Sequence, residues 1–310
     1  MKQTIPKKLA SGVVAAAMTL SLLPAAALAA DSEYSASGAT GSAFTDSGIA
    51  AEDGSYTGYK ISGTDLTIQD SGTYIVSGNC SNGSITIKKG TTGVTLVLDG
   101  LTLTSEDTAP IACNKSSEVK IVAASGTGTL NISAGDDAIH CDYVMNVGAS
   151  GTTGPSITIK ACYEGLEAAT LNILSGNISI LSEDECLNAA NSDFTGYSFS
   201  MTISGGAITA YSSTGDGFDS NGDLTIMGGT VVVWTANTAD DQPLDADGTL
   251  TVSGGTVLAA GGSAGMGVPI SAAQPYVTFG STGAMGGGQM GGSGAPSTLP
   301  GGTNGQQPPA

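Results

Sequence analysis

The sequence of 310 residues predicts an all-β protein, a right-handed parallel β-helix of about eight rungs, where one rung is a turn of three short strands. Two observations lead to this prediction. Short stretches of alternating apolar and polar residues recur between glycine-rich turns, and apolar residues of similar size return at matching positions in successive repeats. Strands that stack like side chains in this way are typical of a solenoid rather than of a β-sandwich.

The repeat is clearest in four ten-residue segments that align without gaps, 171–180, 201–210, 224–233 and 250–259. Each segment has apolar residues at its first, third, eighth and tenth positions, and three of the four have Gly-Gly in the middle. Alternation with a period of two places the apolar residues on one face of a strand. Because glycine reaches backbone angles that other residues avoid, each segment is predicted to form two strands joined by a glycine turn.

A second set of aligned positions lies between these segments and predicts the third strand of each rung. Its first position is large and apolar: Ile111, Ile139, Leu166, Leu187, Phe218 and Leu244. Its third position is small: Cys113, Cys141, Ala168, Ala189, Ser220 and Ala246. Both positions point to the same face of a strand, so we expect two inward ladders. Cys113 and Cys141 then stack, either as a disulfide or as neighbouring thiols.

The two ends of the chain differ from the repeats. Residues 1–30 have the basic start, the short apolar stretch and the small-residue cleavage motif of a signal peptide. Residues 31–58, rich in Ser, Gly and Ala, are expected to form a linker, and residues 59–280 the β-helix. Residues 281–310, rich in Gly, Pro and Gln, are expected to be disordered. We therefore expect a secreted, extracellular protein, either free or associated with a cell surface.

The charge balance restricts the partners. The chain has 27 acidic residues against nine Lys and no Arg, its net charge is −18, and the last cation is Lys160. Such a surface repels nucleic acids and anionic membranes and attracts metal cations. No stretch after the signal peptide is apolar and long enough to span a bilayer. We expect a monomer with neither a nucleic-acid partner nor a membrane span.

The acids recur at matching positions in the repeats. In successive repeats the middle residue of the third strand is His140, Glu167, Asn188, Asp219 and Asp245. Three residues before each of these stand, in the same order, Asp137, Glu164, Glu185, Asp216 and Gln242. Stacked rungs would place these carboxylates in two rows. Within each row, neighbouring carboxylates would lie about 5 Å apart, a distance at which like charges repel. Calcium removes this repulsion because it binds several oxygens at once.

The sequence therefore predicts Ca²⁺ as a cofactor, held by Asp136, Asp137, Glu164, Glu167, Asp184, Glu185, Asn188, Asp216, Asp219, Asp241 and Asp245. The alternative is a solvated acidic edge without metal. His140, the only histidine, is expected to be a surface member of its row rather than a catalytic base.

Three aromatic residues are candidates for stacking on sugar rings. Trp234 and Tyr211 hold equivalent positions after an inward residue and should point outward along one face, whereas Tyr163 precedes an acidic turn. The alternative is that the aromatic rings pack beneath a loop.

The acidic turns also carry a family resemblance. The segments 136–140, 163–167, 183–190 and 215–222, together with the Ser-Gly-Gly-Thr turns, resemble the secreted bacterial carbohydrate-binding β-helix family known from cellulolytic clostridia. The resemblance covers roughly residues 59–280 and implies a pectate-lyase-like fold, calcium ions held by acidic turns, and binding to cellulose and pectic acid. The sequence departs from the family pattern at Cys186 and Pro243, where Gly is usual, and at Gln242, where an acid is usual.

We therefore predict a secreted, calcium-dependent and non-catalytic protein that binds plant cell-wall polysaccharide, namely polygalacturonate (pectin) and cellulose. The alternative is a pectate lyase or another polysaccharide-degrading β-helix enzyme. Lyases of this fold use a Lys or Arg base, and this chain has no Arg and no Lys after Lys160. The Asn-Thr-Asp and His-Gly signatures of polygalacturonases are also missing from the sequence.

Overall fold

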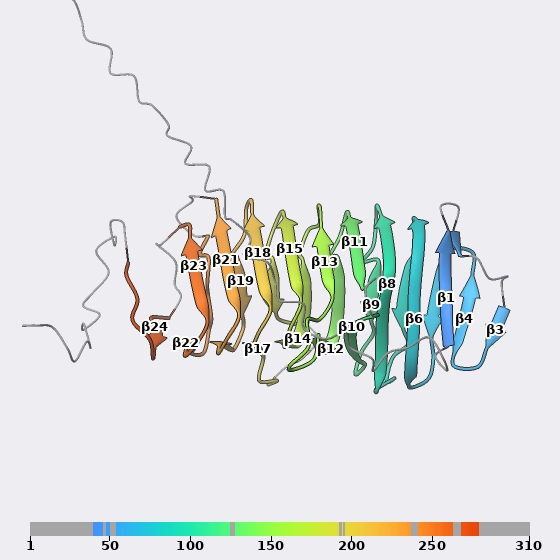
Figure 1. The fold of residues 1–310 in the computed structure, drawn as a ribbon, viewed down its shortest axis with the longest axis horizontal. Helices are drawn as coiled ribbons and strands as arrows, with labels where there is room; N and C mark the ends of the chain where they lie inside the picture. The colour runs from blue at the N-terminus through green and yellow to red at the C-terminus, as the bar shows by residue number, and fades with distance from the viewer. Residues whose placement is uncertain are drawn as a thin grey trace, which may run out of the picture.

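The computed structural model describes residues 40–45, 48–49, 54–124, 128–191, 194, 196–236, 241–262 and 268–278. Figure 1 shows these residues as one elongated stack of short strands. Across this part of the chain the secondary structure consists of strands and turns without a helix, so it contains no helix that could cross a membrane. The predicted all-β parallel β-helix is confirmed.

Three columns of parallel strands run along the stack. The first column consists of β5 (Asp65–Ile68), β7 (Ser84–Ile87), β9 (Ile111–Cys113), the first part of β12 (Ile139–Val147), the first part of β14 (Leu166–Ile173), β16 (Leu187–Ala189) and β19 (Phe218–Ser220). The predicted third strand of each rung is this column.

The other two columns share long strands at the N-terminal end. The second column consists of the first parts of β6 (Gly72–Ser81) and β8 (Val94–Ser105), β10 (Glu118–Ala123), the second parts of β12 and β14, β17 (Ser200–Ile203), β20 (Asp223–Ile226), β22 (Leu250–Val252) and β24 (Ile270–Ala272). The third column consists of the second parts of β6 and β8, β11 (Thr129–Ala134), β13 (Ser156–Ile159), β15 (Asn177–Ser182), β18 (Ala207–Ser212), β21 (Thr230–Thr235) and β23 (Thr256–Ala260).

The pairing register reproduces the predicted inward ladder of the first column. Successive partners are Leu66, Ile85, Ile111, Ile139, Leu166, Leu187 and Phe218, and Phe218 bridges to Leu244. The stack makes about seven turns, slightly fewer than the eight predicted. The middle residue of each strand in this column must therefore point away from the core, which positions the acidic rows described below.

The core is a continuous hydrophobic filling between the three columns. All five cysteines are buried and free, so Cys113 and Cys141 stack as thiols rather than as a disulfide. Burial raises the pKa of the Cys113 thiol well above its ordinary value, which keeps the thiol neutral. The cysteines therefore act as small apolar core residues.

The glycine turns between the second and third columns stack on one another. Gly206, Gly229 and Gly255 have φ values of 87°, 84° and 83°, in the left-handed region. A Cβ atom on Gly229 would lie 2.7 Å from the carbonyl oxygen of Gly206, and one on Gly255 would lie 2.7 Å from that of Gly229. Backbone angle and close approach both require glycine here, which explains the repeated Gly-Gly.

Strand pairing at the N-terminal end begins earlier than the predicted domain boundary at residue 59. β1 (Thr40–Thr45) pairs in parallel with β6, and β2 (Gly48–Ile49) pairs with β1. β3 (Gly54–Tyr56), β4 (Tyr59–Ser62) and β5 form an antiparallel set. Residues 31–58, predicted as a linker, thus contain three strands, of which β1 pairs with β6, β2 with β1 and β3 with β4. Short strands at the end of a sheet can pair without the alternating pattern of the repeats. The predicted signal peptide and the predicted C-terminal tail lie outside the described residues.

Candidate functional site

The outward positions of the first column form a polar row. His140, Glu167, Asn188 and Asp219 are successive partners in the parallel ladder. Asp245 follows Leu244, which bridges to Phe218, and so continues the row. Neighbouring strands in a sheet lie about 4.8 Å apart, which brings each side chain against the next.

The turn before each of these strands supplies a second row. Backbone hydrogen bonds hold the turns in register: the Ala138 N–H donates to the Glu164 carbonyl (2.8 Å), and the Gly165 N–H donates to the Glu185 carbonyl (2.9 Å). The same contact joins the Gly217 N–H to the Gln242 carbonyl (2.8 Å). The carboxylates of the turns therefore stack beside those of the strands, as the sequence analysis expects.

Three groups of side chains in these rows bring ligand atoms within 4.8 Å of one another. They are the His140 cluster (Asp137, His140 and Glu167), the Glu164 cluster (Glu164, Asp184 and Glu185) and the Asp216 cluster (Asp216, Asp219 and Asp245). Eight of the eleven predicted metal ligands fall in these clusters. The remaining three, Asp136, Asn188 and Asp241, lie beside them.

In the Glu164 cluster the carboxyls of Glu164 and Glu185 hold protons at neutral pH in the absence of metal. Burial raises the pKa of Glu164 to about 8, and the charges of Glu167 and Asp137 raise it further. Burial also raises the pKa of Glu185 to about 8, with a smaller contribution from Asp184. A bound cation would favour the ionised forms instead, because it supplies the opposite charge that these groups lack.

The Asp216 cluster shows the same effect to a smaller degree. Burial raises the pKa of Asp216 and of Asp219 to about 6, and the neighbouring Asp245 raises both. The Gln242 backbone N–H donates to Asp216 Oδ1, which opposes part of the rise. Because this contact uses the backbone of residue 242, it does not depend on the acid that the family pattern has there.

The His140 cluster contains its own cation. His140 Nδ1 lies 3.0 Å from Asp137 Oδ2 and contacts Glu167 Oε2, and His140 Nε2 lies 3.3 Å from Asp142 Oδ1. The hydrogen bonds with Asp137 and Glu167 raise the pKa of His140 to about 11, so the imidazole is charged at neutral pH. Sequence reasoning missed this role and missed Asp142, although Asp142 stands two residues after His140 and the period of a strand could have indicated it.

Two buried oxygens beside the clusters have no hydrogen-bond partner in the described residues, Asn188 Oδ1 and Asp241 Oδ2. The Asn188 side chain donates from Nδ2 to Glu164 Oε2 (3.0 Å), so its free oxygen lies next to the Glu164 cluster. Asp241 precedes Gln242, whose backbone N–H donates to Asp216 Oδ1, so Asp241 adjoins the Asp216 cluster. An unsatisfied buried oxygen is costly. A cation ligated by these oxygens would remove that cost, so the residues present fit a bound metal ion.

An open groove of about 910 Å³ continues the acidic surface beyond the His140 cluster. Its acidic and basic lining residues are Asp65, Glu106, Asp107, Asp136, Asp137 and His140. The predicted ligand Asp136 therefore lines this groove rather than completing a cluster. The acidic surface thus extends along most of the first column.

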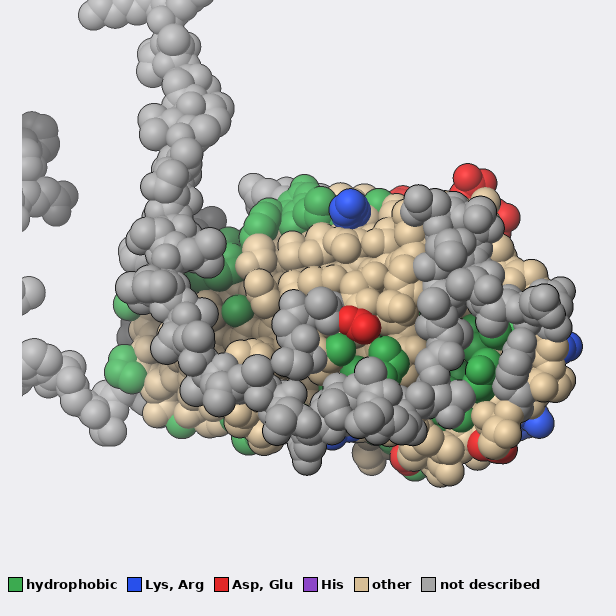
Figure 2. Space-filling model, turned by 45° about the vertical axis from the view of Figure 1, so that its right-hand side comes forward, with side chains coloured by type: hydrophobic (Ala, Val, Ile, Leu, Met, Phe, Trp, Pro, Cys, Tyr) green, Lys and Arg blue, Asp and Glu red, His purple; other side chains and the backbone are tan. Residues whose placement is uncertain are grey.

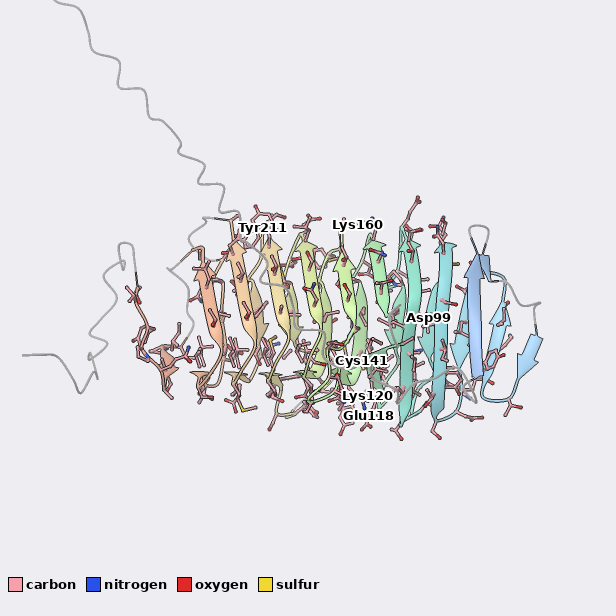
Figure 3. All side chains as sticks on the ribbon, in the orientation of Figure 1. Asp99, Glu118, Lys120, Cys141, Lys160 and Tyr211 are labelled. Atoms are coloured by element: carbon pink, nitrogen blue, oxygen red, sulfur yellow. The ribbon has the colours of Figure 1, made fainter. Side chains whose placement is uncertain are left out.

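The predicted outward aromatics lie on a different face, over the third column. Tyr211 and Trp234 are partners in the ladder, with ring centroids 5.7 Å apart and an interplanar angle of 37°. Leu181 precedes them in the same row and is 49% exposed, and Trp234 is 38% exposed. Figure 3 shows Tyr211 at the upper edge of the stack, and Figure 2 shows hydrophobic side chains gathered along that edge. We call Leu181, Tyr211 and Trp234 the aromatic row.

Tyr163 does not belong to the aromatic row. Its backbone N–H donates to the Asp136 carbonyl (3.0 Å), which places it in the stack of acidic turns. Hydrogen bonding with Asp184 raises the pKa of the Tyr163 hydroxyl to about 12. Tyr163 therefore borders the Glu164 cluster, with its side chain exposed.

A second aromatic group was not predicted. Tyr143, Phe194, Tyr197 and Phe199 contact one another, with ring centroids 5.4–6.2 Å apart. The Tyr197 hydroxyl is 2.8 Å from the Thr170 hydroxyl. These residues come from the bulge of β12 and from the connection between β16 and β17, outside the repeat, so periodicity gave no signal for them. These rings pack mainly against one another, whereas the aromatic row follows the ladder of the third column.

Comparison with known proteins identifies the family. A family model described as carbohydrate-binding domain-containing protein matches residues 62–129 and 127–265. The fold is similar to that of the polysaccharide lyase-like protein from C. thermocellum, solved as a gadolinium derivative, with 21% sequence identity and a TM-score of 0.56. The alignment covers 76% of this chain and 97% of that chain. No curated protein matches the sequence. The chain therefore belongs to the family of carbohydrate-binding domain-containing proteins.

Proposed function

We propose that this chain is a secreted protein that binds cell-wall polysaccharide with the help of calcium and does not cleave it. Membership of the family supports polysaccharide binding in general. The observation that supports calcium is the pair of all-oxygen clusters that lack an internal cation, each beside a buried oxygen that has no hydrogen-bond partner among the described residues.

The chemistry of the ligands favours calcium over other metals. The Glu164 and Asp216 clusters offer carboxylates only, and the adjacent Asn188 offers an amide oxygen. Oxygen ligands suit hard cations such as Ca²⁺ and Mg²⁺, whereas zinc and copper favour histidine and cysteine. Calcium tolerates irregular sets of about six to eight oxygens, while magnesium demands a near-ideal octahedron. Carboxylates fixed by the register of a solenoid fit the more tolerant ion.

The two faces suit two kinds of polymer. A polyanion such as polygalacturonate is repelled by the acidic rows, and a calcium ion held there would reverse the sign of the interaction locally. A neutral polymer such as cellulose offers flat apolar ring faces, which stack on aromatic side chains. In the aromatic row Leu181 and Trp234 are exposed, Tyr211 is half-buried, and no side chain carries a charge, so the row suits the neutral polymer.

The lack of a Lys or Arg after Lys160 argues against a lyase site at the Glu164 and Asp216 clusters. All residues of the Glu164 and Asp216 clusters lie between positions 164 and 245, and the sequence has no Lys or Arg after Lys160. In the described structure Lys160 lies at the upper edge of the stack (Figure 3), beyond the end of β13 in the third column. His140 is held as a cation between three carboxylates, which makes it a poor proton acceptor.

Polymer pull-downs on metal-free protein test this proposal. Retention on polygalacturonate should require added calcium and disappear with chelator, whereas retention on cellulose should survive the chelator. Pectate retention without calcium would contradict the calcium bridge. In parallel, incubation of polygalacturonate with the calcium-loaded protein should release neither unsaturated products nor new reducing ends. Release of unsaturated products would instead support the lyase alternative.

A further inference from the structure

The two ends of the solenoid differ in how their last strands are capped. At the N-terminal end, β4 pairs antiparallel with β5 and with β3, and β1 covers β6. Tyr59 and Ile61 of β4 are buried, so the core is closed there. At the C-terminal end, β23 pairs with β21 on one side, and no strand of the described residues pairs with its other side.

The inward ladder of the third column is uncovered at this last strand. Val231 and Val233 in β21 are each 1% exposed. Their partners in β23 are Val257, which is half-buried, and Ala259, which is exposed. Residues that point into the core along the rest of the stack thus face solvent on β23, beside backbone groups that pair with no strand of the described residues. An edge strand of this kind is a template for pairing with another strand.

Exposed apolar side chains also gather at this end. Leu258, Ile270, Tyr276 and Val277 are 56%, 44%, 65% and 75% exposed. The sequence has no charged residue after Asp247, although the whole chain carries a net charge of −18. Natural edge strands are usually protected by charged side chains, proline or bulges, and β23 has none of these. Two copies of this acidic protein could therefore approach through this end without charge repulsion.

We propose that β23 pairs with β23 of a second copy of the chain, so that two solenoids join through their C-terminal ends. Pairing of the same strand from both copies makes a two-fold symmetric contact, which closes a dimer and does not propagate. The dimer would cover Val257 and Ala259 with the equivalent residues of the partner. The third-column sheets of the two copies would then join into one continuous sheet.

Two other occupants of the edge are less suitable. A head-to-tail stack would need an open N-terminal end, and β3, β4 and β1 close that end. The chain continues for 32 residues after Thr278, and this segment is rich in Gly and Pro, which are unfavourable in a strand. A second copy offers instead a β-branched and apolar strand that is already ordered in its own sheet.

Sedimentation analysis of the full secreted chain over a range of concentrations tests this proposal. The wild-type chain should form a dimer, both in calcium and in chelator. Ala259→Lys places a charge at an inward position of the edge and should weaken dimerisation by about tenfold or more. Thr209→Lys is the matched control, because it adds the same charge at an exposed position of β18, two strands away from the edge. It should change the dissociation constant by less than about twofold.

Three results would overturn the proposal. The first is a wild-type chain that stays monomeric at all concentrations. The second is a dimer that Ala259→Lys leaves intact while circular dichroism shows the variant folded, since the contact then lies elsewhere. The third is a dimer that forms with calcium and dissociates in chelator, which would indicate metal bridges between acidic surfaces. Dimerisation that only Ala259→Lys abolishes supports the pairing of β23.

Discussion

The His140 cluster and the Asp216 cluster occupy equivalent places in the repeat but balance their charge differently. In the first, an imidazolium lies between Asp137 and Glu167. In the second, three aspartates converge, and the ladder position equivalent to His140 is Asp219. One residue type at one position therefore decides whether a rung carries its own cation. The Glu164 cluster resembles the Asp216 cluster in this respect.

The largest expected effect is on stability against pH in the absence of metal. The folded-state pKa values of Glu164 and Glu185 are about 8, above the ordinary 4.5, so the folded state holds protons that the unfolded state releases between these values. Raising the pH through this window therefore destabilises the metal-free protein, by about 3 kcal/mol after allowance for partial exposure. Asp216 and Asp219, with pKa values of about 6, add to the loss at lower pH.

Thermal melts in chelator and in millimolar calcium measure this effect. Two sites that bind calcium in the folded state alone should raise the melting temperature at pH 8 by on the order of 10 °C. At pH 5 the gain should be smaller, because protons then compete with calcium for the carboxyls. Melting curves that coincide in calcium and chelator at both pH values would show that the clusters tolerate their charge without metal.

A second prediction concerns the internal cation. His140→Asn removes the imidazolium and leaves Asp137 and Glu167 facing each other, which should cost about 1–3 kcal/mol in chelator. Calcium should restore part of this loss, so the variant should respond to calcium more strongly than the wild type. Asp142→Asn removes the charge at the 3.3 Å contact with His140 Nε2, and an amide oxygen there can still accept from Asn191 Nδ2, so this variant should cost less. If His140→Asn does not enlarge the calcium response, the His140 cluster differs from the others by more than its histidine.

A third prediction concerns the role of the Asp216 cluster in binding polygalacturonate. Asp216→Asn with Asp219→Asn should weaken calcium-dependent retention on polygalacturonate by about tenfold or more, because the cluster loses two of its three charges. Asp70→Asn with Asp99→Asn makes the same change in net charge outside the clusters and is the control. Retention on cellulose should be unchanged in both variants. Equal loss of pectate binding in both pairs would mean that net charge, rather than the cluster, sets the affinity.

The repeat made the fold and the two acidic rows predictable, because period-two alternation and matched apolar positions fix which residues share a face. The same reasoning could not find β1, because its sequence Thr-Gly-Ser-Ala-Phe-Thr lacks the period-two alternation of the repeats. It also could not assign a charge to His140, since that depends on contacts with Glu167 in the next rung and with Asp142 across the same strand. Tyr143 and Phe194 meet through an irregular connection, which a periodic pattern does not describe.

The smallest expected effect separates the aromatic row from the acidic rows. Trp234→Ala removes an exposed ring that stacks with Tyr211, and the loss of one aromatic contact is worth about 0.5–1.5 kcal/mol, or roughly two- to tenfold in affinity for cellulose. Met227→Ala removes a side chain of similar exposure outside the row and should leave cellulose binding unchanged. Calcium-dependent pectate binding should be the same in both variants, because the row lies over the third column and the clusters lie on the first. If Trp234→Ala instead reduced pectate binding, one polymer chain would have to contact both faces, and the division of function between the two columns would be wrong.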